Sequence, residues 1–293
     1  SGGLDSAYLA YLGYTWGLRI LAIHIDDGFD TEISKQNIKK LTAATGIKML
    51  TICPDSEQYC DLIKAFIKSE VPDIAMPQDN ILFAFLYATA KQYKIKSFLS
   101  GGNFALECIL QQGNAHSAYD VVHIKDIHKK FGTKPINKLK FITSIKKEID
   151  KRFLGLQTIR PLNYIDYNRD RAFKELNEFC DFKYYGSKHL ENMLTAFIQL
   201  YWMPVKFGID KRNSHLSSMI VSGQMTREKA LECLRQPIAD DDVLLSYIDF
   251  VREKLELSKE ELKAIMLAPP KAHESYKVEK LAPMLFKMKN LLK

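Results

Sequence analysis

The first half of the chain alternates short apolar runs with longer segments in which apolar residues recur every three or four positions. Short runs of aliphatic and β-branched residues predict buried strands, and the longer period predicts helices. We expect strands at residues 19–26, 48–53 and 95–100. We expect helices at residues 7–17, 31–45, 56–69 and 80–93. Because strands and helices alternate, the pattern predicts an α/β fold with a parallel sheet and crossover connections.

The second half of the chain shows helical periodicity and no strand pattern. Beyond residue 168 we expect helices at 169–179, 191–201, 226–235, 240–256, 258–266 and 282–292. One of them begins with the spacing of a capping box, Ser258 followed by Glu261. The segment 113–143 is polar, basic and poorly periodic, and we interpret it as a loop or lid. We therefore predict an α/β domain at 1–165 and a mostly helical domain at 166–293.

Composition and length are those of a soluble globular protein. The 293 residues suffice for one large domain or two ordinary ones, and 46% hydrophobic with 26% charged residues is a globular balance. No apolar run has the length of a membrane span and the sequence shows no signal peptide, so we expect a cytoplasmic protein. The five cysteines lie singly, which argues against a disulfide framework or a zinc ribbon.

The formal net charge of +7 favours a polyanionic ligand such as ATP, pyrophosphate, a nucleotide sugar or RNA. A solvated lysine-rich surface also explains the charge, because much of it lies in ordinary stretches such as Lys129–Lys151. Charge alone therefore leaves the ligand open, and the choice depends on motifs.

The hexapeptide Ser1–Ser6, S-G-G-L-D-S, is the most informative motif. Its two glycines permit a tight turn, and the apolar positions that follow predict a helix directly after it. Backbone N–H groups and the positive end of the helix dipole meet at such a turn, which makes it a phosphate site. Asp5 suits this site if it holds Mg²⁺ or orients the loop. A loop of this kind follows a strand, so we expect an N-terminal strand that is missing ahead of Ser1.

Two further loops are expected at the same edge of the sheet. Asp26–Gly28 follows the first predicted strand, and Ser100–Asn103 follows the third. Because ligands of parallel sheets bind at the carboxyl ends of strands, we expect Ser1–Ser6 and these two loops to converge on one nucleotide. Each loop also has an alternative interpretation. Asp26 and Asp27 could help to bind a metal instead, and Gly101 and Gly102 could form an ordinary turn without a ligand.

A dense basic cluster falls in the predicted helical domain. Its members are Lys188, His189, Lys206, Lys211, Arg212 and His215. Aromatic residues interrupt the cluster, which favours a partly buried anion site over a solvated basic face. Glu191 and Asp210 are its obvious acidic partners. Because Leu4 brings no charge to the phosphate loop, we expect some of the phosphate charge to be met by Lys188, Lys206, Lys211 or Arg212.

The hexapeptide resembles the PP-loop, S-G-G-x-D-S, of the N-type ATP pyrophosphatases, which cleave ATP between its α and β phosphates. Three stretches extend the resemblance: I-D-D-G-F-D-T-E at 25–32, Y-G-S-K-H-L-E at 185–191 and K-F-G-I-D-K-R-N-S-H-L-S at 206–217. Together they look like the N-acetyl sugar amidotransferase family of surface-polysaccharide and flagellin-glycan biosynthesis. The resemblance implies a PP-loop domain, of the adenine nucleotide alpha hydrolase-like fold, followed by a helical domain.

The resemblance also implies a reaction. ATP adenylates the acetamido oxygen of a sugar or nucleotide sugar, pyrophosphate leaves, and ammonia displaces AMP to give an acetamidino sugar for the O-antigen of lipopolysaccharide (LPS) or for a flagellin glycan. Such an enzyme is an AMP-forming carbon–nitrogen ligase of the amidotransferase type. The implied cofactors are ATP and Mg²⁺. The implied partner is a class I glutaminase subunit that supplies ammonia.

Roles for individual residues follow from the same resemblance. Those implied to bind ATP are Ser1, Gly2, Gly3, Asp5, Ser6, Ile25, Asp26, Gly101, Gly102, Lys206 and His215. Those implied to be catalytic are Asp5, Lys188, His189, Lys211 and Arg212, with Asp5 also the metal ligand. His189 or His215 is a candidate proton shuttle, because an imidazole titrates near neutral pH.

Departures from the family pattern leave alternatives open. Relatives often carry cysteine pairs where this chain has Val71–Pro77, which contains no cysteine and so argues against a zinc site there. Ser187 and Asn192 also depart from the expected G-K-H-x-E-S form. One alternative is a PP-loop enzyme that adenylates tRNA, although the chain lacks patterned cysteine pairs and we do not expect nucleic acid as substrate. The other is a non-catalytic nucleotide-binding subunit.

Overall fold

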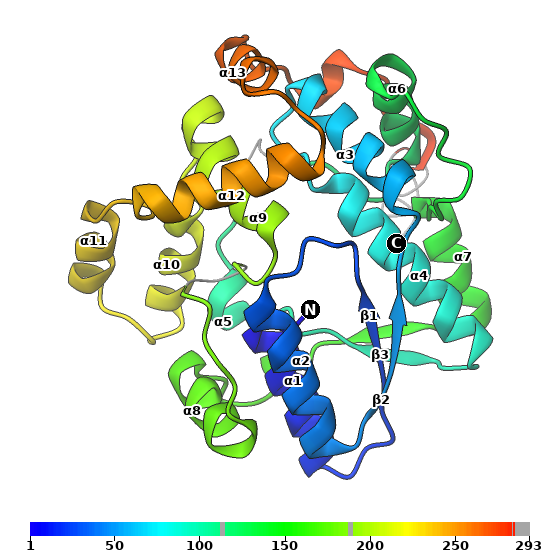
Figure 1. The fold of residues 1–293 in the computed structure, drawn as a ribbon. Helices are drawn as coiled ribbons and strands as arrows, with labels where there is room; N and C mark the ends of the chain where they lie inside the picture. Colours follow the sequence, from blue (N-terminus) through cyan, green and yellow to red (C-terminus); the bar gives the residue numbers. More distant parts are fainter. Residues whose placement is uncertain (112–114, 187–189, 283, 285–293) are drawn as a thin grey trace. The chain divides into compact units, whose positions relative to one another are not determined.

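The computed structural model describes residues 1–111, 115–186, 190–282 and 284 (Figure 1). The chain divides into two compact units, each formed by three segments. Unit 1 contains Ser1–Cys53, Phe98–Gln112 and Thr158–Val251, and unit 2 contains Pro54–Ser97, Gly113–Gln157 and Arg252–Lys293. The predicted boundary after residue 165 stays a prediction. In the part of the chain that the structure describes, no helix has the length and apolar character needed to cross a membrane.

Unit 1 begins with a helix followed by a parallel β-α-β unit. Helix α1 (Leu4–Thr15) starts directly after the glycine pair, three residues earlier than predicted. Strands β1 (Leu21–Ile25) and β2 (Lys48–Ile52) pair in parallel, and helix α2 (Glu32–Thr45) connects them. Gly46 ends α2 in the left-handed conformation, with a φ of 66°. The predicted α/β arrangement is confirmed here.

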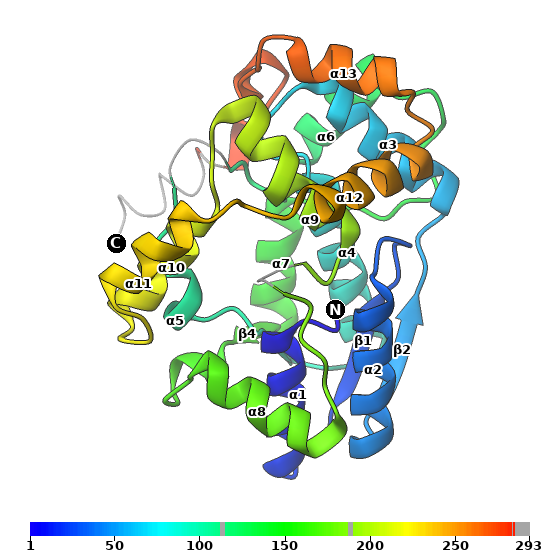
Figure 2. The same cartoon turned by 60° about the vertical axis from the view of Figure 1, so that its left-hand side comes forward.

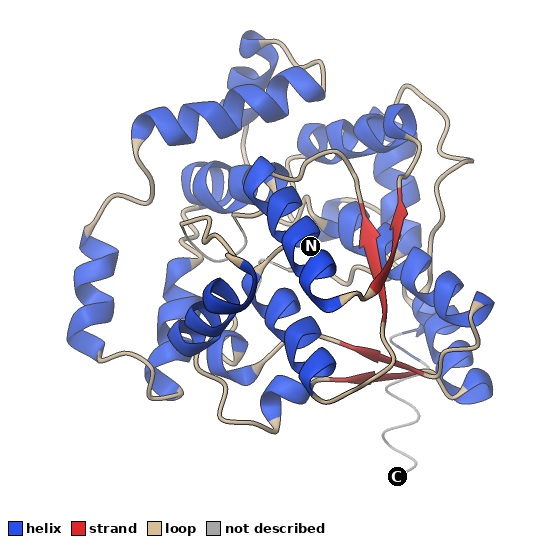
Figure 3. Ribbon diagram, turned by 60° about the horizontal axis from the view of Figure 1, so that its bottom comes forward, coloured by secondary structure: helices blue, strands red, loops and turns tan. Residues whose placement is uncertain are grey.

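A second pair of strands is separate from the first. β3 (Ser97–Leu99) pairs with β4 (Gln157–Ile159): the Gln157 N–H donates to the Lys96 carbonyl and the Ser100 N–H to the Ile159 carbonyl, both at 2.8 Å. Figure 3 shows the two pairs as separate red arrows. The expectation of one sheet is therefore corrected to two small ones. β4 escaped prediction because its three residues are all exposed and form no apolar run.

The remainder of unit 1 is helical, as predicted for the C-terminal part. Its helices are α5 (Phe104–Glu107), η1 (Pro161–Asn163), α8 (Arg169–Cys180), α9 (Met193–Phe197), the π-helix η2 (Ile198–Lys206), α10 (Arg212–Val221), α11 (Arg227–Arg235) and most of α12 (Asp241–Lys254). Helix α8 lies beside α1 and α2 (Figure 2). Their shared core includes Tyr8, Tyr167, Leu176 and Phe182. This core supports the loop that precedes α1.

Unit 2 is built mainly from helices. They are α3 (Ser56–Ser69), α4 (Met76–Gln92), α6 (Val121–Phe131), α7 (Ser144–Leu154), α13 (Lys259–Leu267) and η3 (His273–Ser275). The predicted capping box at Ser258 and Glu261 is confirmed. The loop predicted at 113–143 is wrong in its middle, because α6 lies there. Asp120 caps that helix, whose buried face carries Ile124 and Ile127.

Candidate functional site

Hydrogen bonds of serine hydroxyl groups connect the two ends of the loop before α1. The Ser1 and Ser6 hydroxyl oxygens lie 3.1 Å apart, and Ser6 Oγ donates a 3.1 Å hydrogen bond to the Gly3 carbonyl. Gly2 has a φ of 73°, a conformation that side chains disfavour, and a Cβ there would lie 2.5 Å from the Ser34 carbonyl oxygen. A Cβ on Gly3 would meet the Glu191 carboxyl group. The turn therefore needs glycine at position 2, whereas a side chain at position 3 would displace the Glu191 carboxyl group.

A cavity of about 180 Å³ lies at this loop, within unit 1. Its lining residues are Ser1, Gly3, Leu4, Asp5, Ser6, Gly101, Gly102, Leu106, Glu107, Arg169, Tyr184, Tyr185 and Glu191. Sites for whole drug-sized ligands measure roughly 300–1,000 Å³. The cavity therefore suits one part of a nucleotide, such as its phosphates, better than the whole molecule.

Two of the three loops expected to converge do meet at this cavity. A Cβ added to Gly101 would lie 3.1 Å from the backbone carbonyl carbon of Asp5 and from the backbone nitrogen of Ser6. The loop after β3 therefore touches the first turn of α1, and only glycine allows the approach without a shift. Gly102 lies in looser surroundings, where a Cβ would come no closer than 3.4 Å to the Ser100 hydroxyl.

The described lining is more acidic than basic. Asp5, Glu107 and Glu191 contribute three carboxyl groups, Arg169 contributes a guanidinium group, and the Ser1 amino group interacts with Glu191. Burial raises the pKa of Glu191, and its Oε2 has no hydrogen-bond partner among the described residues. A phosphate group placed beside these acids needs a further positive charge, which a divalent metal would supply.

Tyrosine side chains hold the charged groups of the cavity. The Tyr167 hydroxyl donates a hydrogen bond to Oδ1 of Asp5, and the Tyr185 hydroxyl accepts one of 2.9 Å from the Leu4 N–H. The Arg169 guanidinium donates to the Tyr184 hydroxyl and lies 5.0 Å from the centre of that ring. Burial, followed by the charge of Asp5, raises the pKa of Tyr167, so this phenol stays a donor at neutral pH.

The loop after β1 reaches the cavity through backbone pairing with the segment that carries Glu191. The Thr31 N–H donates to the Glu191 carbonyl at 3.0 Å, and the Met193 N–H donates to the Phe29 carbonyl at 2.7 Å. Asp30 forms an antiparallel bridge with Asn192 between these bonds. The loop is therefore a neighbour of the cavity, although Ile25 and Asp26 do not line it.

The structure divides the predicted site residues into three groups. Those that line the cavity are Ser1, Gly3, Asp5, Ser6, Gly101 and Gly102. Those that are described but lie outside its lining are Gly2, Ile25, Asp26, Lys206, Lys211, Arg212 and His215. The remaining two, Lys188 and His189, lie outside the described residues. Their implied roles stay predictions.

Within the described part of the basic cluster, Arg212 makes many hydrogen bonds to other groups of the protein. Arg212 makes a forked contact with Asp210, at 3.0 Å from Nε and 2.8 Å from Nη2, and its Nη1 donates to the carbonyls of Cys233, Gln236 and Pro237. The predicted acidic partner Asp210 thus pairs with this guanidinium. These bonds tie the start of α10 to the end of α11, which gives Arg212 a structural function alongside its predicted one.

Several residues that line the cavity were not predicted from the sequence to be site residues. Glu107, Arg169, Tyr184 and Tyr185 belong to no phosphate motif, and Glu191 was expected only as a partner of the basic cluster. The available signal was their position: the tyrosine pair directly precedes Gly186, and Arg169 opens a helix. Local pattern did not show that both segments would fold against α1.

Comparison with known proteins adds information on the C-terminal part of the chain. Residues 191–292 match the family model described as "LPS biosynthesis protein WbpG-like, C-terminal domain". No curated protein matches the chain. The match covers the C-terminal third and begins at Glu191 of the cavity lining. It points to LPS biosynthesis.

Proposed function

We propose that this protein is an ATP-dependent amidotransferase of LPS or related surface-glycan biosynthesis. It adenylates the acetamido oxygen of a sugar or nucleotide sugar, and ammonia then replaces AMP to form an acetamidino sugar. The observation that carries the proposal is the glycine turn of Gly2 and Gly3, which opens α1 and places Asp5 in the cavity. The match of the C-terminal third to an LPS biosynthesis domain supports the choice of substrate class.

In this proposal the chain binds and orients the phosphates of ATP. Ser1 and Ser6 line the cavity where the phosphate oxygens would lie, and the N-terminal end of α1 favours negative charge there. The Arg169 guanidinium, held against the Tyr184 ring, adds a fixed positive charge. Adenylation turns a poor electrophile into one with a good leaving group, and positioning lowers the barrier further.

The acidic lining fits a bound Mg²⁺. Asp5 and Glu191 are the carboxylates that would hold it, because both approach the glycine turn. When bound, Mg²⁺ supplies the charge that stabilises the departing pyrophosphate. Tyr167 orients the Asp5 carboxylate for this purpose. Lys188 and His189 remain candidates for substrate charge and proton transfer, and a class I glutaminase subunit remains the proposed source of ammonia in the cytoplasm.

The test follows the phosphates of ATP. The protein is incubated with ATP, Mg²⁺, ammonium and a panel of UDP- and CMP-linked acetamido sugars, and the nucleotides are resolved by chromatography. We expect AMP and pyrophosphate in equal amounts, dependent on one sugar and lost in Asp5→Ala. Asp166→Ala is the matched control, because that side chain is 92% exposed and outside the cavity lining. ADP as product, or no AMP with any sugar, would overturn the proposal and favour tRNA as acceptor or a non-catalytic role.

A further inference from the structure

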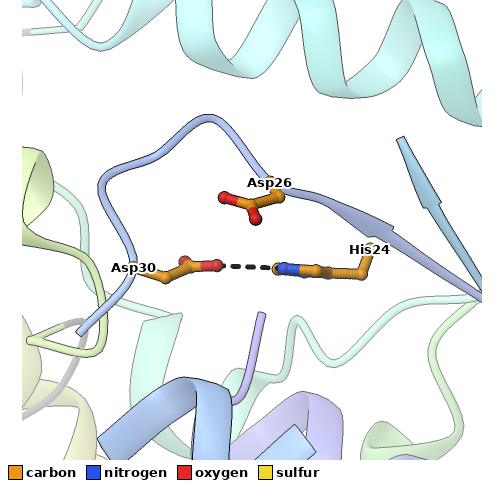
Figure 4. A group of neighbouring side chains, drawn as sticks. All are labelled: His24, Asp26 and Asp30. Carbon is orange, nitrogen blue, oxygen red and sulfur yellow. Dashed lines mark ion pairs between the residues drawn. The ribbon is translucent and has the colours of Figure 1, made fainter. Parts of the chain in front are cut away.

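Three side chains converge at the end of β1, beside the cavity but outside its lining (Figure 4). His24 and Asp26 lie two residues apart and so project to the same side of the strand, and Asp30 reaches back from the loop before α2. One ligand atom from each residue lies within 4.8 Å of the other two. His24 Nε2 and Asp30 Oδ2 are 3.0 Å apart.

One oxygen of the buried Asp30 carboxylate lacks a hydrogen bond, although the carboxylate also interacts electrostatically with the buried Ser1 amino group. The Asp30 side chain is 5% exposed. Its Oδ2 atom lies close enough to His24 Nε2 for an ion pair, but the two atoms do not form a hydrogen bond. Oδ2 has no hydrogen-bond partner among the described residues. The pair of His116 and Asp120 shows the alternative: there the imidazole and the carboxylate form a regular hydrogen bond of 2.8 Å. A buried carboxylate oxygen without a donor is costly, and a bound cation removes that cost.

We propose that His24, Asp26 and Asp30 bind a divalent transition-metal ion such as Zn²⁺ or Mn²⁺. One imidazole nitrogen and two carboxylate oxygens form a donor set that suits these ions, whereas Mg²⁺ and Ca²⁺ prefer oxygen ligands alone. Tetrahedral ligands at about 2.0–2.2 Å from a metal lie about 3.3–3.6 Å from one another. The three ligand atoms, which lie within 4.8 Å of one another, are therefore close to the spacing that an ion requires.

The proposed site would keep a coordination position open. Three protein ligands leave the fourth place of a tetrahedral ion to water or to a substrate oxygen. The Thr31 N–H, next in the chain to Asp30, donates to the carbonyl of Glu191, whose side chain lines the cavity. A metal here would therefore lie beside the proposed phosphate site. The inference goes beyond the proposed amidotransferase and does not depend on it, because metal binding is measurable without nucleotide.

The test titrates the metal-free protein with Co²⁺, Zn²⁺, Mn²⁺ and Mg²⁺ in the absence of nucleotide. Calorimetry gives the Kd, and the visible absorption of bound Co²⁺ reports its ligands. We expect one tight transition-metal ion per chain and at least about 10-fold weaker binding in Asp30→Asn and Asp26→Asn, since even the loss of an outer-shell partner costs that much. Asp26 is only partly buried, and asparagine keeps the oxygen that accepts the 3.0 Å bond from Gly28 N–H, so this variant tests the site with little risk to folding.

Two controls decide where the ion binds. His128→Gln removes an imidazole that lies 3.4 Å from the Asp61 carboxylate in unit 2, and it should leave the Kd unchanged. Asp5→Ala should also keep the Co²⁺ spectrum, because Asp5 is outside the proposed ligand set. Absence of a tight ion, equal Kd values in wild type and both asparagine variants, or loss of the ion in Asp5→Ala would each overturn the proposal.

Discussion

The hydroxyl of Tyr167 donates a hydrogen bond to Oδ1 of Asp5, joining the segment before α8 to the first turn of α1. The two residues lie 162 positions apart in the chain. Burial and the neighbouring carboxylate both raise the pKa of Tyr167, which keeps the phenol protonated. The contact therefore fixes the direction of the one carboxylate that the phosphate loop itself contributes.

Removing this hydroxyl should lower the proposed activity. Hydrogen bonds to charged groups contribute about 1.5–3 kcal/mol, so Tyr167→Phe should slow AMP formation by about 10-fold or more. Tyr8→Phe is the matched control, since it removes a 2.9 Å bond from Tyr8 to Glu175 in the same core but outside the cavity lining. Initial rates of pyrophosphate release check the prediction, and an equal loss in both variants would show a general effect on folding instead.

The two glycines after β3 should differ in their tolerance of a methyl group. Gly101→Ala forces the Asp5–Ser6 backbone away and should destabilise unit 1 by about 1–3 kcal/mol, as overpacking does. It should also weaken ATP binding. Gly102→Ala meets only ordinary contacts at 3.4 Å or more and should change stability by less than about 0.5 kcal/mol. Urea unfolding and ATP titration of the pair check the prediction, and equal behaviour would contradict the close approach.

Because of its hydrogen bonds, Arg212 should contribute to the free energy of unfolding independently of any catalytic function. Lysine cannot reproduce a fork to Asp210 together with bonds to three carbonyls, so Arg212→Lys should cost about 1–3 kcal/mol. Arg171→Lys removes a 3.1 Å contact to the exposed Asp166 and should cost less than about 1 kcal/mol. Chemical unfolding of both variants measures the difference. If the two agree, the tie between α10 and α11 contributes nothing to stability.

The sequence predicts individual helices and strands better than it predicts which distant segments of the chain contact one another. Helix α3 begins and ends where its pattern indicates, because one apolar face repeats without interruption from Ser56 to Ser69. Helix α6 was missed although Val121, Ile124 and Ile127 recur at helical spacing and Asp120 caps it, because the polar, lysine-rich sequence around it was interpreted as one loop. The two glycine loops were expected to meet because strand ends share an edge. Nothing local indicates that Arg169 and Glu191 would fold onto α1, since that depends on how α8 packs.

A row of buried histidines in unit 2 makes a pH-dependent contribution to its stability. The His273 Nδ1 and His123 Nε2 atoms lie 2.9 Å apart, and the far nitrogens of the two rings meet the Asp73 N–H at 3.4 Å and the Lys277 carbonyl at 3.1 Å. This chain of bonds needs both imidazoles neutral, because each ring donates once and accepts once. His116 stacks on His273, with ring centres 4.8 Å apart.

Burial, together with the charge of His116, lowers the pKa of His123 and lowers that of His273 to about 3. Both folded-state pKa values thus lie below the unfolded value of about 6.5, so the unfolded chain binds more protons in acid. The contribution is fully present above pH 6.5 and is lost as the pH falls toward 3. His273 should remove up to about 1.4 kcal/mol of stability per pH unit within that window, and His123 acts in the same direction below pH 6.5.

Replacing one of these histidines should flatten the pH dependence of unfolding. In His273→Gln, the free energy of urea unfolding should fall less steeply between pH 6.5 and 4.5, by up to about 1.4 kcal/mol per pH unit. Tyr276→Phe is the matched control, because it removes a 2.8 Å bond to the Ser69 carbonyl in the same cluster but does not titrate in this range. It should lower stability at every pH without changing the slope. A slope in His273→Gln equal to that of the wild type would show that this imidazole is already charged in the folded protein.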